Sequence, residues 1–522
     1  MLKRKLLLGD EAIAQGAIDA GISGAYSYPG TPSTEIMEYV MESNQAKIRN
    51  IHRQWSSNEK TALEAALGAV YSGRRALVSM KHVGLNVAAD PFVNSAITGV
   101  NGGLVLAVAD DPSMHSSQNE QDTRFYAKFA RVPLLEPTDQ QEAYELTRRA
   151  FDLSERFDLP AIIRLTTRLA HSRADVELLE PRPENKLEPV TEHNRYTLIP
   201  LNARQNYRKL LDKSEELEQF SEESELNKIH GTSGSDRGVI AAGIGYSYFK
   251  ECTQSELDIP SLHVSLYPAP KQKILEFADN FEEIVVLEDG QPFLEEFLRD
   301  ARAERLEIHG RLDGTLPRDG ELTPDSVATA LETETTATFS APEDLPGRPP
   351  RLCPGCPHAD SFEFLREVLE ANDEARAFSD IGCYTLGFLP PYEAIHTCVD
   401  MGASITMAKG AADAGLHPAL AVIGDSTFTH SGMTGLLDAI YENSAITVII
   451  LDNATTAMTG GQDSLAEIGL EDICQGLGVE EQHLHVLKPL STEKDKNLAV
   501  LKEEVEHRGV SVLIVRRPCV QI

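Results

Sequence analysis

Two short polar runs near the C-terminal end of the sequence could together hold a metal ion and a diphosphate. The first is Gly424-Asp425-Ser426, and the second contains Asn453 and Thr455. The Asp425 carboxylate, the Asn453 side chain and the Thr455 carbonyl are hard oxygen ligands, and Mg²⁺ usually takes few protein oxygens beside water and substrate phosphates. The turn at Gly424 and the N–H groups after it can face the phosphates. The two runs therefore predict a magnesium-diphosphate site.

Two strands must place these polar runs side by side. The apolar segments 419–423 and 445–451 are typical of buried strands, and 434–441 between them is typical of a helix. In such a strand-helix-strand unit both loops open at the carboxyl ends of parallel strands, where α/β sheets bind ligands. Gly-Asp-Ser alone is a weak signal, because Asp commonly ends a strand or caps a helix. The second run at this interval favours a thiamine diphosphate fold.

Four cysteines could form a metal centre in the same part of the chain. Cys353 and Cys356 belong to a C-x-x-C turn, and Cys383 and Cys519 follow singly. Four thiolates could hold a [4Fe–4S] cluster or a zinc ion. Zinc is the commoner ligand of an isolated C-x-x-C, but the usual second C-x-x-C is absent, so both interpretations stay open. We expect the other three cysteines (252, 398 and 474) to be small buried hydrophobic residues.

The N-terminal part contains a possible anion site at Thr31. A predicted strand, 24–28, turns at Pro29-Gly30, and we expect Thr31 to be the N-cap of a helix whose first residue is Pro32. A helix N-terminus with hydroxyl groups can bind a carboxylate or phosphate. Ordinary helix capping is the alternative explanation.

Glu59 could be a buried acid, because it opens a predicted helix, 56–71, on the same face as several apolar residues. Thiamine diphosphate needs a buried Glu beside its aminopyrimidine ring for proton transfer. A capping box formed by Ser56 and Glu59 is the competing explanation. Lys81 and His82 follow another predicted strand, 76–80, and the polar run 110–121 follows the strand 103–108. Both could line a ligand crevice or be solvated loops.

The order of these elements predicts an α/β protein with three folded blocks and two linkers. We place the blocks at 1–190, 237–312 and 351–522, with a charged linker at 191–236 that includes a solvated helix, and a Pro- and Thr-rich linker at 313–350. Further strands are predicted at 161–165, 238–242, 263–266, 283–287 and 510–515.

Composition excludes several classes of protein. The 522 residues carry a net charge of −33, which repels nucleic acid and anionic membranes. No apolar run is long enough for a membrane span, and the run after Lys5 is too short for a signal peptide. Seven cysteines in so long a chain do not indicate a secreted disulfide scaffold, so we expect a cytoplasmic protein.

Together these residues resemble the α subunits of indolepyruvate ferredoxin oxidoreductases, within the thiamine diphosphate-dependent 2-oxoacid oxidoreductases. The resemblance covers nearly the whole chain. It rests on the loops at Gly424 and Asn453 and on five motifs: Tyr28-Pro29-Gly30-Thr31-Pro32-Ser33, Asn58-Glu59-Lys60, Met80-Lys81-His82-Val83-Gly84-Leu85-Asn86, His115-Ser116-Ser117-Gln118-Asn119-Glu120 and Cys353-Pro354-Gly355-Cys356-Pro357-His358.

The resemblance implies a fold and roles for the residues named above. The first block would be a pyrimidine-binding domain, the last a diphosphate-binding domain, and the middle block would resemble a transketolase C-terminal domain. Glu59 would activate the cofactor ring, Thr31 would lie beside the substrate carboxylate, and His82 would belong to the catalytic residues. Gly424, Asp425, Ser426, Asn453 and Thr455 would bind the cofactor and Mg²⁺. The resemblance favours a [4Fe–4S] cluster over zinc at Cys353, Cys356, Cys383 and Cys519.

The implied reaction is oxidative decarboxylation of an aryl pyruvate to the aryl-acetyl-CoA. The implied partners are a smaller β subunit, coenzyme A and ferredoxin. The family's α subunit continues into a ferredoxin-like domain, whereas this sequence ends soon after Cys519, so we expect electrons to pass directly to a partner or a separate small ferredoxin. Two alternatives stay open: a non-oxidative thiamine-dependent 2-oxoacid decarboxylase, and a catalytically silent scaffold subunit with zinc at the cysteines.

Overall fold

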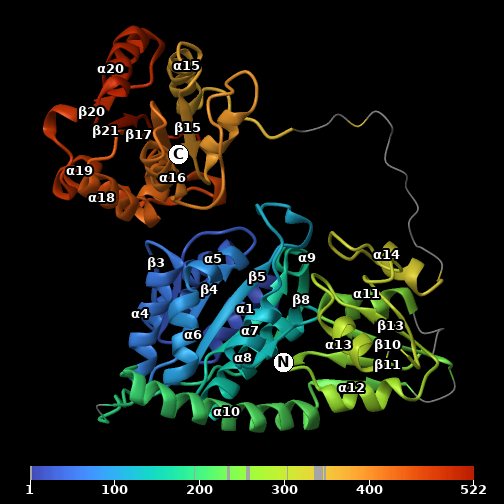
Figure 1. The fold of residues 1–522 in the computed structure, drawn as a ribbon. Coiled ribbons are helices and arrows are strands. Elements are labelled where there is room, and N and C mark those ends of the chain that lie inside the picture. Colours follow the sequence, from blue (N-terminus) through green and yellow to red (C-terminus); the bar gives the residue numbers. More distant parts are fainter. Residues whose placement is uncertain are drawn as a thin grey trace. The chain divides into compact units, whose positions relative to one another are not determined.

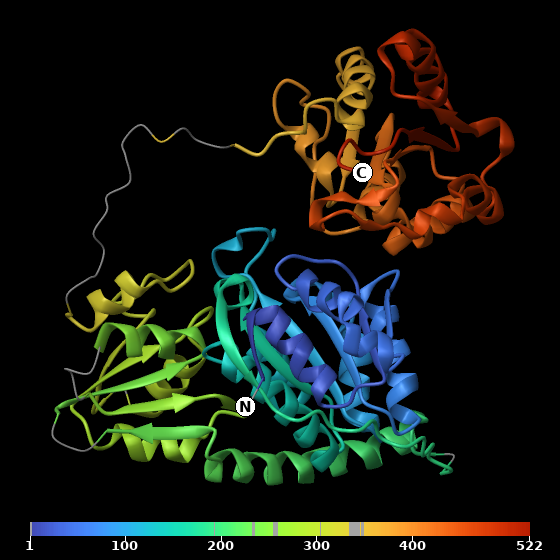
Figure 2. The ribbon, with the colours of Figure 1, turned by 180° about the vertical axis from the view of Figure 1, so that it is seen from behind.

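The computed structural model describes residues 3–192, 194–231, 235–253, 259–302, 304–333, 345 and 349–522. The chain divides into two compact units, Met1–Ser340 and Ala341–Ile522, which are shown as ribbons in Figures 1 and 2. Both units are α/β, with sheets of mainly parallel strands. The α/β fold class predicted from the sequence is confirmed.

The first unit is built around a seven-stranded sheet in the order β12-β6-β7-β5-β4-β2-β3. All its pairs are parallel except β12 with β6. Its strands are β2 (Gly24–Ser27), β3 (His52–Trp55), β4 (Ala76–Lys81), β5 (Leu104–Asp110), β6 (Leu134–Leu135), β7 (Ala161–Thr166) and β12 (Leu266–Tyr267). A separate antiparallel pair joins β1 (Lys3–Leu8) to β8 (Arg173–Leu178).

Helices cover both faces of the seven-stranded sheet (Figures 1 and 2). Every residue of β4, β5 and β7 is buried, as expected of parallel strands between two helical layers. The helices are α1 (Gly9–Asp19), α2 (Thr34–Glu42), α3 (Asn44–Ile48), α4 (Glu59–Tyr71), α5 (His82–Val87), α6 (Ala89–Thr98), α7 (Thr123–Ala130), α8 (Gln140–Phe157) and α9 (Thr167–His171).

A five-stranded sheet in the order β14-β13-β10-β11-β9 completes the first unit. Its strands are β9 (Asn227–His230), β10 (Arg237–Ala242), β11 (Ser261–Val264), β13 (Glu283–Leu287) and β14 (Glu307–His309). Its helices are α11 (Ile244–Thr253), α12 (Lys271–Ala278) and α13 (Phe293–Arg302). The predicted single strand 263–266 is wrong, because the Asn227 side chain accepts hydrogen bonds from the N–H groups of Ser265 and Leu266 and interrupts the ladder. The chain then enters the seven-stranded sheet as β12.

Both predicted linkers contain regular structure. The range 191–236 includes α10 (Pro200–Glu223), which runs along the lower edge of the unit in Figure 1, and the edge strand β9. The α10 helix buries Leu210 and Leu217, so it is not wholly solvated as we expected. The range 313–350 includes α14 (Pro324–Ala330), while 334–344 and 346–348 lie outside the described residues.

The second unit contains a fully parallel sheet in the order β15-β16-β17-β21-β20. Its strands are β15 (Arg376–Ser379), β16 (Ala419–Gly424), β17 (Ile446–Asp452), β20 (Leu484–Leu487) and β21 (Val510–Arg516), and a short pair joins β18 (Thr455–Thr456) to β19 (Gln462–Asp463). Its helices are α15 (Pro357–Glu370), α16 (Ala403–Asp413), α17 (Asp425–Thr427), α18 (Met433–Glu442), α19 (Leu470–Leu477) and α20 (Lys494–Glu506). Two apolar cores lie on its two sides.

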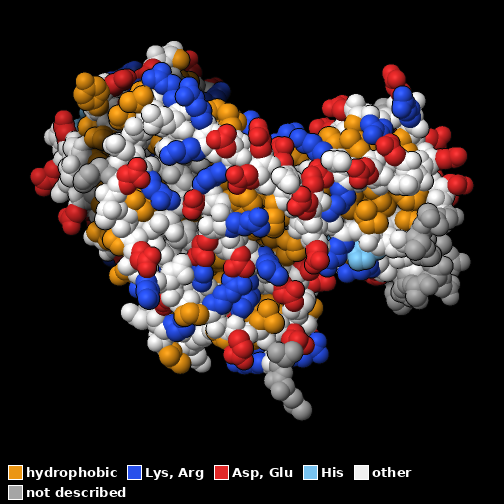
Figure 3. Space-filling view, turned by 90° about the horizontal axis from the view of Figure 1, so that it is seen from below, with side chains coloured by type: hydrophobic (Ala, Val, Ile, Leu, Met, Phe, Trp, Pro, Cys, Tyr) orange, Lys and Arg blue, Asp and Glu red, His pale blue; other side chains and the backbone are white. Residues whose placement is uncertain are grey.

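The surface carries charges of both signs. Figure 3 shows Lys and Arg side chains interspersed with Asp and Glu on one face, without a continuous region of a single sign. In the described part of the chain, no helix combines the length and the apolar character needed to cross a membrane.

Buried ion pairs join the two sheets of the first unit. The Arg164 guanidinium is 0% exposed, donates to Asp110 at 2.6 Å and to the Asp289 carbonyl at 2.9 Å, and also pairs with Glu136. Arg124 donates to Glu288 at 2.6 Å. Removing one member would leave buried charges without partners.

We predict that Arg164→Met lowers the free energy of unfolding of the first unit by about 3–5 kcal/mol, because Asp110 and Glu136 would lose their counter-charge. Arg149→Met, on the exposed face of α8, is the matched control and should change it by less than about 0.5 kcal/mol. Denaturant titrations measure both. Equal effects of the two substitutions would contradict the role given to the buried pairs.

Candidate active site

The second unit places its polar residues at the carboxyl ends of neighbouring parallel strands. Asp380 follows β15, Asp425 follows β16, Asn453 follows β17 and Cys519 lies beyond β21. These four strands are adjacent, so residues from distant parts of the sequence gather at one edge of the sheet. This is where α/β sheets bind ligands.

Asp425 is the strongest candidate for a metal ligand at this edge. The residue is 2% exposed, and its Oδ2 atom has no hydrogen-bond partner. Burial, with the nearby Asp452 carboxylate, raises the pKa of Asp425 to about 7. A divalent cation would give the unpartnered oxygen a ligand bond and favour its ionised form, so this residue fits the predicted Mg²⁺.

The other predicted diphosphate residues lie at or just after the ends of β16 and β17. The Asn453 Oδ1 atom accepts a long hydrogen bond of 3.3 Å from the N–H of Thr455, and Ala454 between them has a φ of 64°. A left-handed alanine is strained, and such strain gathers at functional loops. Ser426 shares a 2.6 Å hydrogen bond with Thr456. Gly424 leaves room for an aromatic ring, because a Cβ there would lie 2.5 Å from Cε1 of Tyr384.

The four predicted cluster cysteines lie close enough to affect one another's charge. Burial raises the pKa of Cys383 to about 11, and the thiols of Cys356, Cys519 and Cys353 contribute in that order. Cationic metal would reverse this shift by stabilising the thiolates. Among the described residues, no three cysteine sulfurs lie within 4.8 Å of one another. Four thiolates in this arrangement could hold either a [4Fe–4S] cluster or a zinc ion.

The cysteine group is joined to the predicted diphosphate site by direct hydrogen bonds. The Cys519 N–H donates to the Asn453 carbonyl at 3.0 Å, and the Arg517 guanidinium donates to the Gly355 carbonyl at 2.6 Å. His358, two residues after Cys356, lies 3.4 Å from the Asn453 side chain, and burial lowers the pKa of its imidazole to about 4. The segment after β21 therefore connects the C-x-x-C turn to the loop after β17.

The remaining cysteines differ from the expectation in part. Cys474 is buried and Cys252 is half-buried, but Cys398 is exposed. The prediction that all three are buried is therefore wrong for Cys398.

The seven-stranded sheet of the first unit also places polar residues at the carboxyl ends of neighbouring parallel strands. Thr31 follows β2, Glu59 follows β3, Lys81 and His82 lie at the end of β4, and Ser116 follows β5. These four strands are adjacent in the order β5-β4-β2-β3. The structure thus brings the predicted residues of the N-terminal block to one sheet edge.

Glu59 is buried at the first position of α4. Gly84 packs directly against it, because a Cβ at Gly84 would lie 2.6 Å from Oε1 of Glu59. The capping box between Ser56 and Glu59 is wrong: Asn58 is the N-cap, and its side chain accepts from the N–H of Thr61 at 2.9 Å. Glu59 is therefore not needed to cap its helix.

Thr31 lies before its helix and is not the N-cap. The helix α2 begins at Thr34 with Ser33 as N-cap, because the Thr34 hydroxyl and the Ser33 hydroxyl both bond to the backbone of Gly30 and form a tight turn. The Thr31 carbonyl accepts a 3.0 Å hydrogen bond from the Ser116 hydroxyl. Thr31 thus belongs to a loop that is held by the polar run after β5.

Lys81 is a buried cation beside that loop. Its Nζ atom donates to the Ser116 carbonyl at 3.1 Å, and its side chain lies 3.2 Å from the position of a Cβ on Gly30. Burial lowers the pKa of Lys81 to about 8, against the opposing effect of the Asp111 and Glu59 carboxylates. An ammonium group held in this way can bind an anion.

His82 is buried next to Lys81. Its Nε2 atom lies 3.1 Å from the Asn119 carbonyl, whereas its buried Nδ1 atom has no hydrogen-bond partner. One ring nitrogen is therefore available to a ligand, and the other is fixed by the loop after β5.

Sequence reasoning did not identify three of these residues. Lys81 was noticed only as a residue after a strand, and His358 and Asp380 were given no role. Asp380 is fully buried and accepts from the hydroxyl groups of Ser404 and Tyr384, and burial raises its pKa to about 7. The position of Asp380 directly after a buried strand was a usable signal. His358 has none, because its contact with Asn453 joins residues far apart in the sequence.

Comparison with known families supports both units. Residues 15–225 match the family "Pyruvate flavodoxin/ferredoxin oxidoreductase, thiamine diP-bdg". Residues 380–515 match "Thiamine pyrophosphate enzyme, C-terminal TPP binding domain". The two thiamine diphosphate-binding folds predicted from the sequence are thus confirmed.

Individual relatives cover almost the whole chain. The indolepyruvate oxidoreductase subunit IorA of Methanothermobacter marburgensis is 41% identical over 99% of this chain and 87% of its own length. The protein of the same name from Archaeoglobus fulgidus is 39% identical over 99% of this chain and 86% of its own length. Among solved structures, a 2-oxoglutarate:ferredoxin oxidoreductase from Magnetococcus marinus is similar in fold, with a TM-score of 0.51, 16% identity, and coverage of 63% of this chain and 65% of that chain.

We predict that Gly424→Ala weakens cofactor binding and lowers the free energy of unfolding of the second unit by about 1–3 kcal/mol, because the added methyl group overlaps the Tyr384 ring. Gly410→Ala is the matched control, since a Cβ there meets nothing within 4 Å and α16 should gain up to about 1 kcal/mol from alanine. Thermal unfolding and thiamine diphosphate titration measure both. A Gly424→Ala chain with unchanged stability and affinity would contradict the packing argument.

Proposed function

Since this chain belongs to the family of indolepyruvate oxidoreductase subunits IorA, we propose that it oxidatively decarboxylates an aryl pyruvate to the aryl-acetyl-CoA and passes the electrons to ferredoxin. The chain is an oxidoreductase with thiamine diphosphate-binding domains, and its relatives support oxidation of a 2-oxoacid. The aryl side chain is supported by the names of those relatives.

One observation favours an oxidative reaction over the alternatives. The cysteine group is hydrogen-bonded to the loop that carries Asn453, through the Cys519 N–H and the Asn453 carbonyl. A non-oxidative decarboxylase has no need of a metal centre beside its diphosphate loop. The names of the relatives as oxidoreductase subunits support a reaction over a catalytically silent scaffold.

Each cofactor has a set of residues in the chain that could hold it. In the second unit, Asp425, Asn453 and Thr455 would hold Mg²⁺, Gly424 and Ser426 would face the diphosphate, and the four cysteines would hold a [4Fe–4S] cluster. In the first unit, the buried Glu59 would hold or give a proton at the aminopyrimidine ring. When bound, thiamine diphosphate supplies the electron sink for decarboxylation, and the cluster supplies one-electron transfer.

Residues of the first unit would also orient the substrate. Lys81 places a cationic group beside the Thr31 loop, which suits the carboxylate of a 2-oxoacid in a protein whose net charge is −33. Thr31 would add a hydroxyl group at the same carboxylate. His82, with one unpartnered ring nitrogen, would bind a substrate oxygen or move a proton there.

A second, smaller subunit, coenzyme A and ferredoxin would complete the system. This part of the proposal rests on the family alone. The acyl group needs coenzyme A as its acceptor, and the two electrons need an external carrier.

We predict that Lys81→Met raises the KM for the aryl pyruvate about 10- to 100-fold, as expected for the loss of one hydrogen bond to a charged group. In the unaltered enzyme, kcat/KM should fall as pH rises through about 8, because the free ammonium loses its proton. Lys81→Arg should remove that fall, since arginine stays charged. Steady-state kinetics from pH 6 to 10 measure this.

Lys60→Met, on the exposed face of α4, is the matched control and should leave KM unchanged. An unchanged KM in the Lys81→Met enzyme would show that Lys81 does not bind the substrate.

We predict about four irons and four sulfides per chain in anaerobically purified protein, with a reducible [4Fe–4S] signal by EPR. Cys383→Ser should abolish that signal, because one cluster ligand is lost. Cys474→Ser, a buried cysteine outside the group, should retain it. Zinc in place of iron, or no metal, would exclude the oxidative reaction and favour the decarboxylase or the scaffold.

A further inference from the structure

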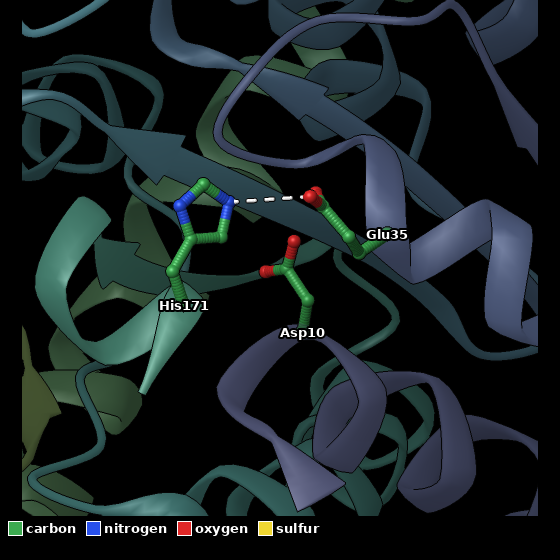
Figure 4. Close-up of side chains that lie close together, drawn as sticks. All are labelled: Asp10, Glu35 and His171. Carbon is green, nitrogen blue, oxygen red and sulfur yellow. Dashed lines mark ion pairs between the residues drawn. The ribbon is translucent and has the colours of Figure 1, made fainter. Parts of the chain in front are cut away.

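Three metal-ligating side chains meet in the first unit, at a place that the proposed reaction does not use. Asp10 is in the first turn of α1, Glu35 is in the first turn of α2 and His171 is the last residue of α9. One ligand atom from each lies within 4.8 Å of the other two. Figure 4 shows the three side chains pointing toward one another from three different elements.

Asp10 lacks the partner that a buried carboxyl group requires. The residue is 0% exposed, and its carboxyl oxygens accept no hydrogen bond from an N–H group or a hydroxyl; the one polar group within reach is the Glu35 carboxyl, with which it could only share a proton. Its carboxyl group points into the gap toward Glu35 and His171 (Figure 4). Burying an unsatisfied carboxyl group is costly. Burial and the Glu35 charge accordingly raise the pKa of Asp10 well above its usual range.

We propose that Asp10, Glu35 and His171 bind a divalent transition-metal ion such as Mn²⁺ or Zn²⁺. One imidazole nitrogen and two carboxylates form a common ligand set for these ions. Two carboxylate charges and a neutral imidazole match the charge of one divalent ion. The cation would also supply Asp10 with the partner that the protein does not.

The cluster is partly exposed, which suits a bound ion with water in its remaining positions. The side chains of Glu35 and His171 are 34% and 36% exposed, whereas Asp10 is fully buried. Solvent therefore reaches two of the three candidate ligands.

The ion would brace the loop that carries Thr31. Glu35 lies on α2, directly after that loop. His171 lies on α9, whose Thr167 hydroxyl donates to Asp111 at 2.6 Å. Asp111 in turn accepts from the N–H of Ser116 at 2.9 Å, and the Ser116 hydroxyl bonds to Thr31. A metal ion bound to ligands on α2 and α9 would thus hold at a fixed separation the two helices to which the Thr31 loop is connected, one along the chain and the other through these hydrogen bonds.

The helix α1 is already set close to α9. A Cβ on Gly9 would lie 2.2 Å from the carbonyl oxygen of Leu169, so only glycine permits this approach. The position of Asp10 relative to His171 is therefore fixed by the backbone, as a preformed metal site requires.

The test uses Mn²⁺ as the probe and the full chain carrying Asp425→Ala, so that the predicted Mg²⁺ site cannot take the ion. Mn²⁺ has little affinity for thiolates, which excludes the cysteine group. Loss of the free Mn²⁺ EPR signal measures binding. We expect one Mn²⁺ per chain, with at least tenfold weaker binding after Asp10→Asn or His171→Gln. Glu42→Gln, an exposed acidic residue at the end of the same α2, is the matched control and should bind normally.

A variant could also bind Mn²⁺ poorly because it is destabilised. Thermal unfolding is a second measurement that detects this case. Mn²⁺ should raise the melting temperature of the Asp425→Ala chain and of the Glu42→Gln variant by several degrees, because it binds only the folded state. It should not raise that of the Asp10→Asn or His171→Gln variants. A chain that binds no Mn²⁺, or binds it equally after Asp10→Asn, would overturn the proposal and leave a shared proton between Asp10 and Glu35 as the explanation.

Discussion

The parallel pairing of strands is the constraint on which both candidate sites depend. In the second unit, β16 and β17 pair in register from Ala419 with Ile446 to Gly424 with Leu451, so Asp425 and Asn453 must emerge at the same edge. Parallel strands cannot be joined by tight turns, and every crossover returns the chain to the opposite edge. The loops that follow the strands do not have to join neighbouring strands directly, so they can carry polar groups. In the first unit the same constraint places Thr31, Glu59, Lys81 and Ser116 at one edge of the seven-stranded sheet.

Buried charges are arranged in two ways in the described part of the chain. The Arg164 and Arg124 side chains are fully buried, and each is surrounded by carboxylates. Asp425, His82 and Asp10 are also buried, yet each retains an atom without a hydrogen-bond partner. Asp289, in the Arg164 network, also keeps one such oxygen, so an unsatisfied atom alone does not identify a ligand site. At Asp425, His82 and Asp10 it supports the proposed sites because other candidate ligands lie nearby.

The sequence predicted the strands well where they are buried on both faces. Segments such as 76–80 and 283–287 are continuous apolar runs, and β4 and β13 follow them closely. The prediction failed where a side chain replaces the backbone ladder, as Asn227 does at Ser265. The prediction of helix starts also failed. Thr31 and Ser56 have side chains that can cap a helix, but in the folded chain Ser33 and Asn58 are the N-caps. The charged composition of α10 predicted a solvated helix, whereas the helix buries Leu210 and Leu217.

The candidate site was predictable to the extent that its residues directly follow strands. Asp425 and Asn453 carry such a signal. Glu59 is indicated instead by the apolar face of its helix, and Cys353 and Cys356 by their C-x-x-C turn. The partial desolvation of Lys81 depends on Gly30 and the loop at Ser116, and the link between Cys519 and Asn453 depends on the position of β21. These are tertiary properties that spacing in the sequence does not encode.

The most direct test of oxidative function is product analysis with the chain co-produced with the proposed small subunit. Indolepyruvate, coenzyme A, thiamine diphosphate, Mg²⁺ and oxidised ferredoxin would be mixed without oxygen, and the acyl-CoA, aldehyde, CO₂ and reduced ferredoxin quantified. The account predicts one aryl-acetyl-CoA and two reduced ferredoxins for each CO₂. Release of the aldehyde with no reduction of ferredoxin would contradict it.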